Sequence, residues 1–315
     1  MPSGVRLYVS LIVLFGSLGL LLFSFQDSLP NVKALSSLRL HNENWTLLKH
    51  QTALEVDPPP DERPFGALVI AAGADTDLKW TVFAKLNWTV YEYDVRQPNN
   101  PDPQLRFPAN KGNEAMIYLS FIIDHYEDLP WATIFMHGHL DAWHQEDNAV
   151  RILGGLNKVA LARQGYISLR CDWFPSCPDE MRPSQHDSVV SGPEADTKGT
   201  EAAIAGNWRL LFPGEKLPAV IASPCCAQFV VTRQAIIRRP KADYERLRNW
   251  LLGSLLEDNH SGRVMEKLWA YLFTGEAVHC PPPEKCACEW FGRCEKQDHE
   301  FTKLPDSFGN LPEWP

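Results

Sequence analysis

Short apolar runs, separated by polar and turn-forming segments, predict the strands of this chain. Residues 66–72 form an apolar run without alternation, which is typical of a strand buried on both faces. Residues 88–95 are rich in aromatic and β-branched side chains, and residues 131–137 form a third apolar run. Two later strands are predicted at residues 219–223 and 226–232.

Helices are predicted between and after these strands. Thr76 is the expected N-cap of a helix over residues 77–86, and Asn113 is the expected N-cap of a helix that ends near Glu127. The second of these helices carries an apolar face made of Ala115, Tyr118, Leu119, Ile122 and Ile123. Three more helices are predicted at residues 199–212, 241–256 and 262–273. Strands that alternate with helices at this spacing predict an α/β fold with a mainly parallel sheet flanked by helices.

A long apolar segment near the amino terminus predicts a membrane anchor. Residues 7–25 carry no charge, and their number is close to the roughly 20 residues that cross a bilayer as a helix. Arg6 precedes the segment and Asp27 follows it, which places the amino terminus in the cytosol. The alternative is a signal peptide cleaved near residues 34–36. We therefore expect a single-pass type II membrane protein.

Composition changes divide the chain into four parts: a cytosolic end and anchor at residues 1–26, a stem at 27–64, a globular α/β domain at 65–275, and a Cys- and Pro-rich tail at 276–315. The stem is polar and broken by proline. A net charge of −9 argues against a protein that binds nucleic acid through its phosphates.

Two features agree with a domain in the Golgi or endoplasmic reticulum lumen or outside the cell. Glycosylation sequons begin at Asn44, Asn87 and Asn259. The chain also has 8 cysteines, an even number that favours disulfides in an oxidising compartment. The candidates are Cys171, Cys177, Cys225, Cys226, Cys280, Cys286, Cys288 and Cys294. The spacing of Cys280, Cys286, Cys288 and Cys294 favours disulfides over a zinc site. The adjacent Cys225 and Cys226 are expected to form disulfides with other cysteines, for which Cys171 and Cys177 are candidates.

Polar clusters follow each of the first three predicted strands. Asp75 and Asp77 follow the first strand, Glu92 and Asp94 lie in the second, and the stretch HGHLDAWH at residues 137–144 follows the third. Because ligands bind at the carboxyl ends of strands in such sheets, we expect these clusters to converge on one edge. His139 and Asp141 have the H-x-D spacing of non-haem iron sites. The same residues are also compatible with a polar loop that binds no metal. The common hydrolase and phosphate-loop motifs do not occur in the sequence.

Several motifs together resemble a fungal and bacterial family known as domain of unknown function 3431. The resemblance covers about residues 65–275. Its motifs are Asn110, Gly112 and Glu114; Leu129-Pro130; His137; Trp143-His144; Cys225-Cys226-x-Gln228-Phe229; and Glu266-x-x-Trp269. The family implies a grouping of proteins but no reaction.

The predicted order of anchor, stem and α/β domain is also remotely similar to the GT-A type of nucleotide-sugar glycosyltransferases, whose nucleotide-binding half is Rossmann-like. That resemblance implies that Asp94 contacts the nucleotide, and that His137, His139 and Asp141 hold its diphosphate directly or through Mn²⁺ or Mg²⁺. Glu266 would be the base that activates the acceptor. The loop lacks the D-x-D motif of those enzymes, and the D-x-D at residues 75–77 follows a different strand. The further candidate site residues are His144 for catalysis and Glu114, Trp143, Gln228 and Trp269 for substrate binding.

Three functions fit these observations. The first is a membrane-anchored, glycosyltransferase-like enzyme that uses a nucleotide sugar and a glycan or small-molecule acceptor. The second is a non-catalytic binding protein of the lumen or cell surface, and the third is a metal-dependent enzyme that tailors a small molecule. The first requires that Asp94, His137, Asp141 and Gln228 line one pocket.

Overall fold

The structure is a computed structural model that describes residues 57–73, 76–184 and 193–294. The anchor predicted at residues 7–25, most of the stem, the Asn44 sequon and Asp75 lie outside these ranges. Within them, no helix combines the length and the apolar character needed to cross a membrane.

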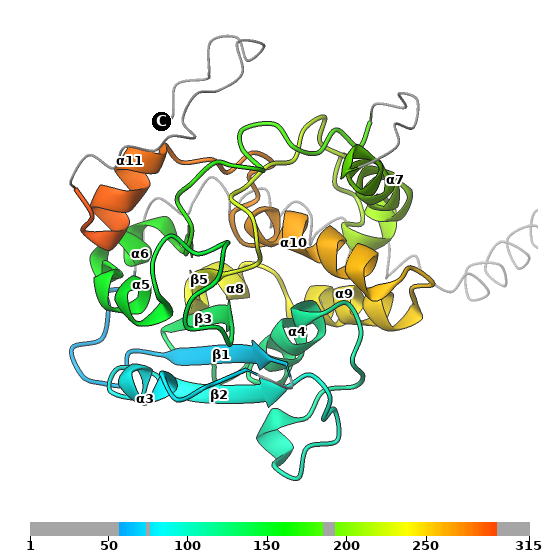
Figure 1. Ribbon diagram of the computed structural model, residues 1–315. Helices are drawn as coiled ribbons and strands as arrows, with labels where there is room; N and C mark the ends of the chain where they lie inside the picture. The colour runs from blue at the N-terminus through cyan, green and yellow to red at the C-terminus, as the bar shows by residue number, and fades with distance from the viewer. Residues whose placement is uncertain (1–56, 74–75, 185–192, 295–315) are drawn as a thin grey trace, which may run out of the picture. The chain divides into compact units, whose positions relative to one another are not determined.

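A five-stranded mixed sheet, in the order β2-β1-β3-β5-β4, lies at the centre of the fold (Figure 1). The strands are β1 (Ala67–Ala72), β2 (Thr89–Asp94), β3 (Ala132–His137), β4 (Tyr166–Ser168) and β5 (Phe229–Thr232). The first three are parallel to one another, whereas β5 runs antiparallel to both of its neighbours. The predicted α/β class with a flanked sheet is therefore confirmed.

The register of the parallel strands brings their carboxyl ends to one edge of the sheet. Ala72 pairs with Asp94, and Ala71 pairs with His137. The expected convergence of the strand ends is thus confirmed for the second and third strands. It explains how residues far apart in the sequence reach one region of the surface.

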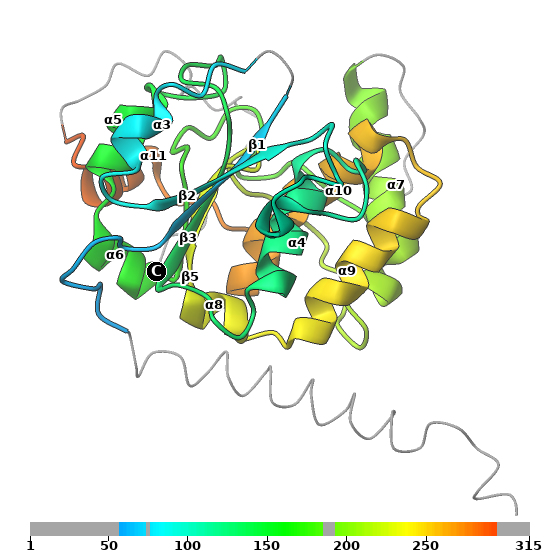
Figure 2. The same cartoon turned by 90° about the horizontal axis from the view of Figure 1, so that it is seen from below.

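Helices cover both faces of the sheet (Figure 2). One layer contains α4 (Glu114–Asp124), α7 (Pro193–Leu211), α8 (Arg233–Ile237), α9 (Lys241–Gly253) and α10 (Asp258–Thr274). The other contains α3 (Thr81–Ala84), α5 (Ala149–Gly155), α6 (Lys158–Gln164), α11 (Pro283–Lys285) and the turn η2 (Cys286–Trp290). The short helix η1 (Pro103–Leu105) lies in the connection after β2. Each layer encloses its own buried apolar cluster against the sheet.

The sequence pattern placed most elements, but several details were wrong. The predicted strand at residues 219–223 forms only isolated bridges, at Ile221 and Ala222. Strand β4 and helices α5 and α6 were not predicted, because such short elements give little periodicity. The helix predicted over residues 77–86 is limited to α3.

Asn113 occupies the N-cap position of α4, as predicted, whereas the N-cap of α3 is Trp80 and not Thr76. The Thr76 hydroxyl accepts a hydrogen bond from the Gly73 N–H at 3.2 Å. Asn113 makes no side-chain cap and adopts a positive φ of 54°. Its amide lies beside α10, where a Cβ on Gly262 would come within 2.7 Å of Asn113 Nδ2. Asn113 therefore sits where α4 and α10 approach each other closely.

All eight cysteines form disulfides, which confirms the predicted disulfide bonding. The pairs are Cys171–Cys286, Cys177–Cys280, Cys225–Cys226 and Cys288–Cys294. The expectation that Cys225 and Cys226 bond to other cysteines is wrong. The segment after β4 lies against the tail, so that Cys171 and Cys177 approach Cys286 and Cys280 to Cα–Cα distances of 5.5 and 5.8 Å. The first two bonds tie the tail to the sheet domain.

Candidate functional site

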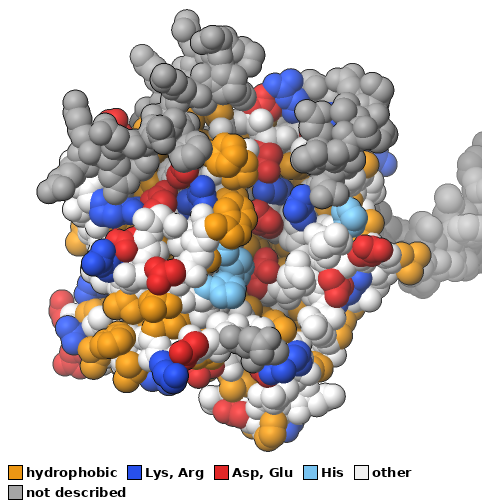
Figure 3. All heavy atoms as spheres, in the orientation of Figure 1, with side chains coloured by type: hydrophobic (Ala, Val, Ile, Leu, Met, Phe, Trp, Pro, Cys, Tyr) orange, Lys and Arg blue, Asp and Glu red, His pale blue; other side chains and the backbone are white. Residues whose placement is uncertain are grey.

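A polar cavity of about 790 Å³ opens at the carboxyl edge of the sheet, between α4, α10 and the segments that follow β3 and β4. In the space-filling view, histidine side chains gather near the centre of this face, with hydrophobic and acidic side chains beside them (Figure 3). Most of the lining is polar or charged: Asn113, Glu114, His137, His144, Asp179, Glu180, Thr197, Asn259, Arg263, Glu266 and Lys267. The remaining lining residues are Trp143, Pro175, Met181, Cys225, Cys226 and Gly262.

A pair of histidines lies on the sheet side of the cavity. His137 is the last residue of β3, and its N–H donates to the Gln228 Oε1 at 3.2 Å. Its ring Nδ1 lies 3.2 Å from the Nε2 of His144, within hydrogen-bond distance. Burial lowers the pKa of His137 to about 4, helped by repulsion from His144 and His139, and burial also lowers the pKa of His144. Both imidazoles are therefore neutral at pH 7.

Two carboxyl groups whose pKa values are shifted in opposite directions face the same cavity. Burial raises the pKa of Glu114, the first residue of α4, to about 7, with repulsion from Glu266 adding to the shift. Glu266 on α10 is also buried, but Lys267 and the Cys226 N–H outweigh the burial, so the pKa of Glu266 is lowered. A carboxyl that titrates near pH 7 beside one that stays ionised is an arrangement suited to proton transfer.

The unpaired nitrogen of His137 points toward the first of these carboxyls. Its Nε2 lies 3.9 Å from Glu114 Oε2 and has no hydrogen-bond partner although it is buried. Buried polar atoms without partners are rare in folded proteins and call for an explanation. Glu114 lines the cavity, so a hydroxyl of a bound molecule can approach its carboxyl group from there.

A buried lysine, Lys267, holds together the cavity wall that lies opposite the histidine pair. Lys267 Nζ lies 2.9 Å from Glu266 Oε1 and 2.9 Å from Glu180 Oε1. It therefore links α10 to the segment after β4, which Cys177–Cys280 also holds. Burial raises the pKa of Glu180, and the attraction of Lys267 opposes that shift.

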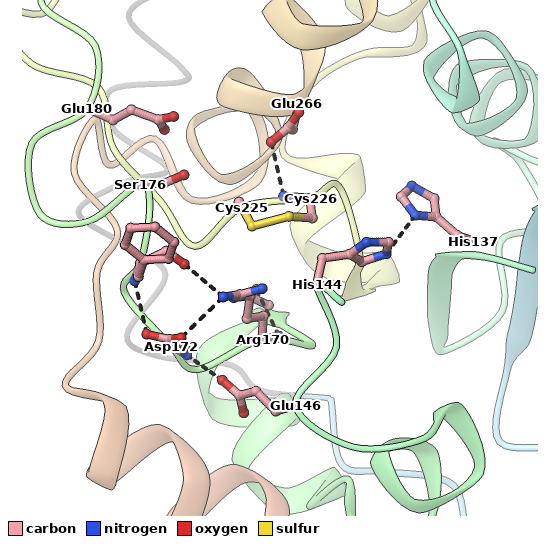
Figure 4. The surroundings of a disulfide bond; sticks show 12 residues. His137, His144, Glu146, Arg170, Asp172, Ser176, Glu180, Cys225, Cys226 and Glu266 are labelled. Atoms are coloured by element: carbon pink, nitrogen blue, oxygen red, sulfur yellow. Dashed lines mark hydrogen bonds and ion pairs between the residues drawn. A yellow bond between two sulfur atoms is a disulfide. The ribbon is translucent and has the colours of Figure 1, made fainter. Parts of the chain in front are cut away.

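A disulfide between neighbouring residues forms part of the wall, between Glu266 and the histidine pair (Figure 4). Cys226 has a φ of 87°, and its N–H donates to Glu266 Oε1 at 3.1 Å. Among the described residues, the non-glycine positions with positive φ are Asn113, Cys226 and Ala227, and the first two line the cavity. Such unusual backbone conformations cluster at functional sites.

Two anchors hold the loop after β3. Trp80 Nε1 donates to the Gly138 carbonyl at 2.8 Å. Glu146 Oε1 accepts hydrogen bonds from the N–H groups of Cys171 and Asp172, and its Oε2 lies 2.6 Å from Arg293 Nη2. The loop is thereby tied to α3, to the segment after β4 and to the tail.

The loop divides the predicted site residues between two cavities. His137, Trp143 and His144 line the first cavity. His139 and Asp141 instead line a second cavity of about 490 Å³, together with Thr76, Asp77, Lys79, Trp80, Phe83 and Leu140. The three residues predicted as metal ligands therefore do not converge on one ion. Within the described ranges, no three His, Cys, Asp or Glu side chains are grouped to hold a metal.

The remaining predicted substrate contacts are scattered. Glu114 lines the first cavity and Gln228 lies behind it, bonded to the backbone of His137. Trp269 is 1% exposed and packs in the core, 5.9 Å from the Tyr118 ring. Asp94 is paired with Arg96 at 2.8 Å and lines neither cavity. The four residues required by the nucleotide-sugar hypothesis thus do not line one pocket.

Comparison with known proteins agrees with the motifs on which the first cavity is built. Residues 68–289 match the family described as Protein of unknown function (DUF3431). The chain belongs to this family. Neither curated proteins nor solved structures provide a further match. All the residues that line the first cavity of this DUF3431 chain fall within the matched span.

Several residues at the cavity of this DUF3431 protein were not singled out from sequence. They are Asp179, Glu180, Met181, Arg263 and Lys267. Lys267 did leave a signal, because it stands with Glu266 in an otherwise apolar run of residues 264–273 and a buried lysine requires acidic partners. Of the described sequons, Asn87 is partly buried and Asn259 is exposed at the cavity, in the first turn of α10.

Proposed function

We propose that this DUF3431 chain is a glycosyltransferase-like enzyme of the secretory pathway whose first cavity holds only the acceptor sugar. The single-pocket form of the nucleotide-sugar hypothesis is wrong, because its four residues do not line one pocket. In the proposed form, Glu114 removes the proton from a hydroxyl of the acceptor sugar, and the donor nucleotide binds outside the cavity. The observation that carries this proposal is the placement of Glu114. Its carboxyl group lies at a polar cavity, 3.9 Å from the unpaired Nε2 of His137. A general base must lie within reach of the hydroxyl it deprotonates, and a ligand oxygen in the cavity beside Glu114 would meet that condition.

The charge balance of the cavity favours an uncharged acceptor. The lining residues include two cations, Arg263 and Lys267, against the carboxyl groups of Glu114, Asp179, Glu180 and Glu266. Glu180 and Glu266 share the ammonium of Lys267, and Asp179 is paired with Arg182. A phosphate would find no surplus of positive charge beside these carboxylates, whereas sugar hydroxyls can donate hydrogen bonds to them. The exposed ring of Trp143 at the rim adds a flat apolar surface of the kind that sugars pack against.

In the proposed reaction, the acceptor hydroxyl gives its proton to Glu114, and its oxygen forms a bond to the anomeric carbon of the donor sugar. The bond between that carbon and the leaving diphosphate oxygen breaks, and the electron pair departs with the nucleotide. The ionised Glu266 orients the acceptor by accepting hydrogen bonds from it. Because Asp94, His139 and Asp141 lie outside the first cavity, we assign this cavity to the acceptor and not to the nucleotide.

Placement in the secretory pathway is part of the same proposal. Four disulfides support an oxidising compartment. The apolar segment at residues 7–25 and the sequons at Asn87 and Asn259 support an anchored protein whose catalytic domain faces the lumen.

The test is transfer activity of the full chain in detergent, measured as nucleotide released from a panel of nucleotide sugars in the presence of free sugars, with and without Mn²⁺. We expect Glu114→Gln to lower the rate by about 100-fold or more, while leaving sugar binding in place. Glu127→Gln, at an exposed position after α4, is the matched control and should keep the wild-type rate. Sugar binding without any turnover would instead indicate a non-catalytic binding protein, and stabilisation by metal alone would favour a metal-dependent tailoring enzyme.

A further inference from the structure

The bond between Cys225 and Cys226 places sulfur on the surface of the cavity. Cys225 is 5% exposed, whereas Cys226 is partly exposed, and both line the cavity. Figure 4 shows the bond with Glu266 on one side and His144 and His137 on the other. The disulfide thus occupies the space between the ionised carboxylate and the histidine pair.

The neighbouring-residue bond gives this part of the wall a fixed shape. It closes a small ring through the peptide bond that joins the two cysteines. The backbone leaves this ring through Cys226 at a φ of 87° and Ala227 at a φ of 49°. This path directs the Cys226 N–H toward Glu266 Oε1, at 3.1 Å. The same short segment therefore presents sulfur to the cavity and positions a carboxylate beside it.

The sulfur surface is apolar, and the groups around it are not. A disulfide donates no hydrogen bond, and sulfur is soft and polarizable, so it packs well against C–H groups. The other apolar contributions to the wall come from Trp143, Pro175 and Met181. Around them lie the carboxyl groups of Glu114, Asp179, Glu180 and Glu266.

A ligand that fits this pattern needs an apolar face and an edge rich in hydrogen-bond donors. A pyranose has both, because C–H groups lie on its ring faces and hydroxyls surround its edge. A nucleobase is also flat, but it offers few donors to a wall of carboxyl groups. An acyclic polyol has the donors but lacks a continuous apolar face.

We propose that the Cys225–Cys226 disulfide is a platform on which the C–H face of a pyranose ring packs, with the ring hydroxyls bonded to the surrounding carboxyl groups. This inference rests on the proposed function, because it specifies which sugar form the acceptor cavity takes. It assigns a role in substrate selection to a pair of residues that take no part in proton transfer.

The experiment measures protection of this disulfide in the full chain. Tris(2-carboxyethyl)phosphine is added with and without a saturating methyl pyranoside of glucose, galactose or mannose, and the freed thiols are alkylated and quantified by mass spectrometry. We expect at least one pyranoside to slow reduction of Cys225–Cys226 by about tenfold or more, and sorbitol to leave the rate unchanged. The Cys288–Cys294 bond, which lies away from the cavity, is the control and should be reduced at the same rate in all samples.

The double variant Cys225→Ala/Cys226→Ala provides a second measurement on the same probes. We expect its Kd for the protected pyranoside to rise by about tenfold, with its circular dichroism spectrum unchanged. A wild-type Kd in this folded variant would overturn the platform. If the variant does not fold, the protection experiment on the wild-type chain decides whether the disulfide is the platform.

The outcomes separate this inference from the proposed function. Pyranoside binding without protection of Cys225–Cys226 overturns the platform and leaves the proposed function standing. Protection combined with wild-type turnover in Glu114→Gln overturns the proposed function and leaves the platform standing. Failure of every pyranoside to bind the wild-type chain overturns both.

Discussion

His137 Nδ1 and His144 Nε2 lie 3.2 Å apart, so two neutral imidazoles share one hydrogen between them. If His137 Nδ1 carries this hydrogen, the His137 Nε2 is an acceptor toward Glu114. If His144 Nε2 carries it, the His137 Nε2 is a donor. The pair therefore couples the end of β3 to the loop that follows it. It also makes the protonation of His137 sensitive to a residue seven positions away.

Replacing His144 by Phe should raise the pKa of His137. The substitution keeps an aromatic ring in place but removes the repulsion that His144 contributes, and burial remains to hold the pKa below its ordinary value. NMR titration of the His137 ring measures this shift. His260→Phe, at a residue on α10 that does not line the cavity, should leave the pKa of His137 unchanged. A lower His137 pKa in His144→Phe would contradict the assigned interaction.

The pH dependence of kcat/KM should report Glu114. Burial raises the pKa of this carboxyl to about 7. A general base works only when deprotonated, so kcat/KM should rise with pH through about 7 and level off above it. His137 stays neutral above pH about 4 and adds no step near neutrality. A rate that falls as the pH rises through this range would identify Glu114 as an acid and contradict its role as base.

Removing the buried charge of Lys267 should destabilise the fold strongly. Lys267→Met leaves Glu180 and Glu266 buried without their shared cation, and the loss of one partner of such a pair costs about 3–5 kcal/mol. The free energy of unfolding in urea, followed by tryptophan fluorescence, measures the effect. Lys79→Met removes a pair whose lysine is 91% exposed, and it should change the free energy of unfolding by less than about 0.5 kcal/mol. Equal effects of the two substitutions would disprove a special role for Lys267.

Gly66→Ala should destabilise the sheet. A Cβ at position 66 would lie 2.0 Å from the carbonyl oxygen of Ala132, so β1 and β3 would have to separate, at a cost of about 3 kcal/mol or more. Gly206→Ala is the matched control, because it lies on α7 with nothing within 4 Å of the added methyl group. That substitution should stabilise the chain by about 0.5–1 kcal/mol through helix propensity. Thermal unfolding of both variants gives the comparison, and an unchanged Tm in Gly66→Ala would refute the close approach.

Elements whose signal is local could be predicted from the sequence alone. The apolar runs that became β1 and β3 and the long apolar face of α4 could be read directly, because burial imposes a pattern on consecutive residues. The rule that ligands bind at the carboxyl ends of parallel strands then pointed to the region around His137. Motif resemblance added Glu114, Trp143, His144 and Glu266, all of which line one cavity.

Which of these residues lie together depends on how the chain folds in three dimensions. His137 and His144 line one cavity, and His139 and Asp141 line another, although the four lie within eight positions of the sequence. The bonding of Cys171 to Cys286 and of Cys177 to Cys280, the contact of Lys267 with Glu180 and the raised pKa of Glu114 likewise depend on segments distant in sequence. Periodicity reports whether a residue is buried, whereas its partners and its protonation depend on what the rest of the folded chain places around it.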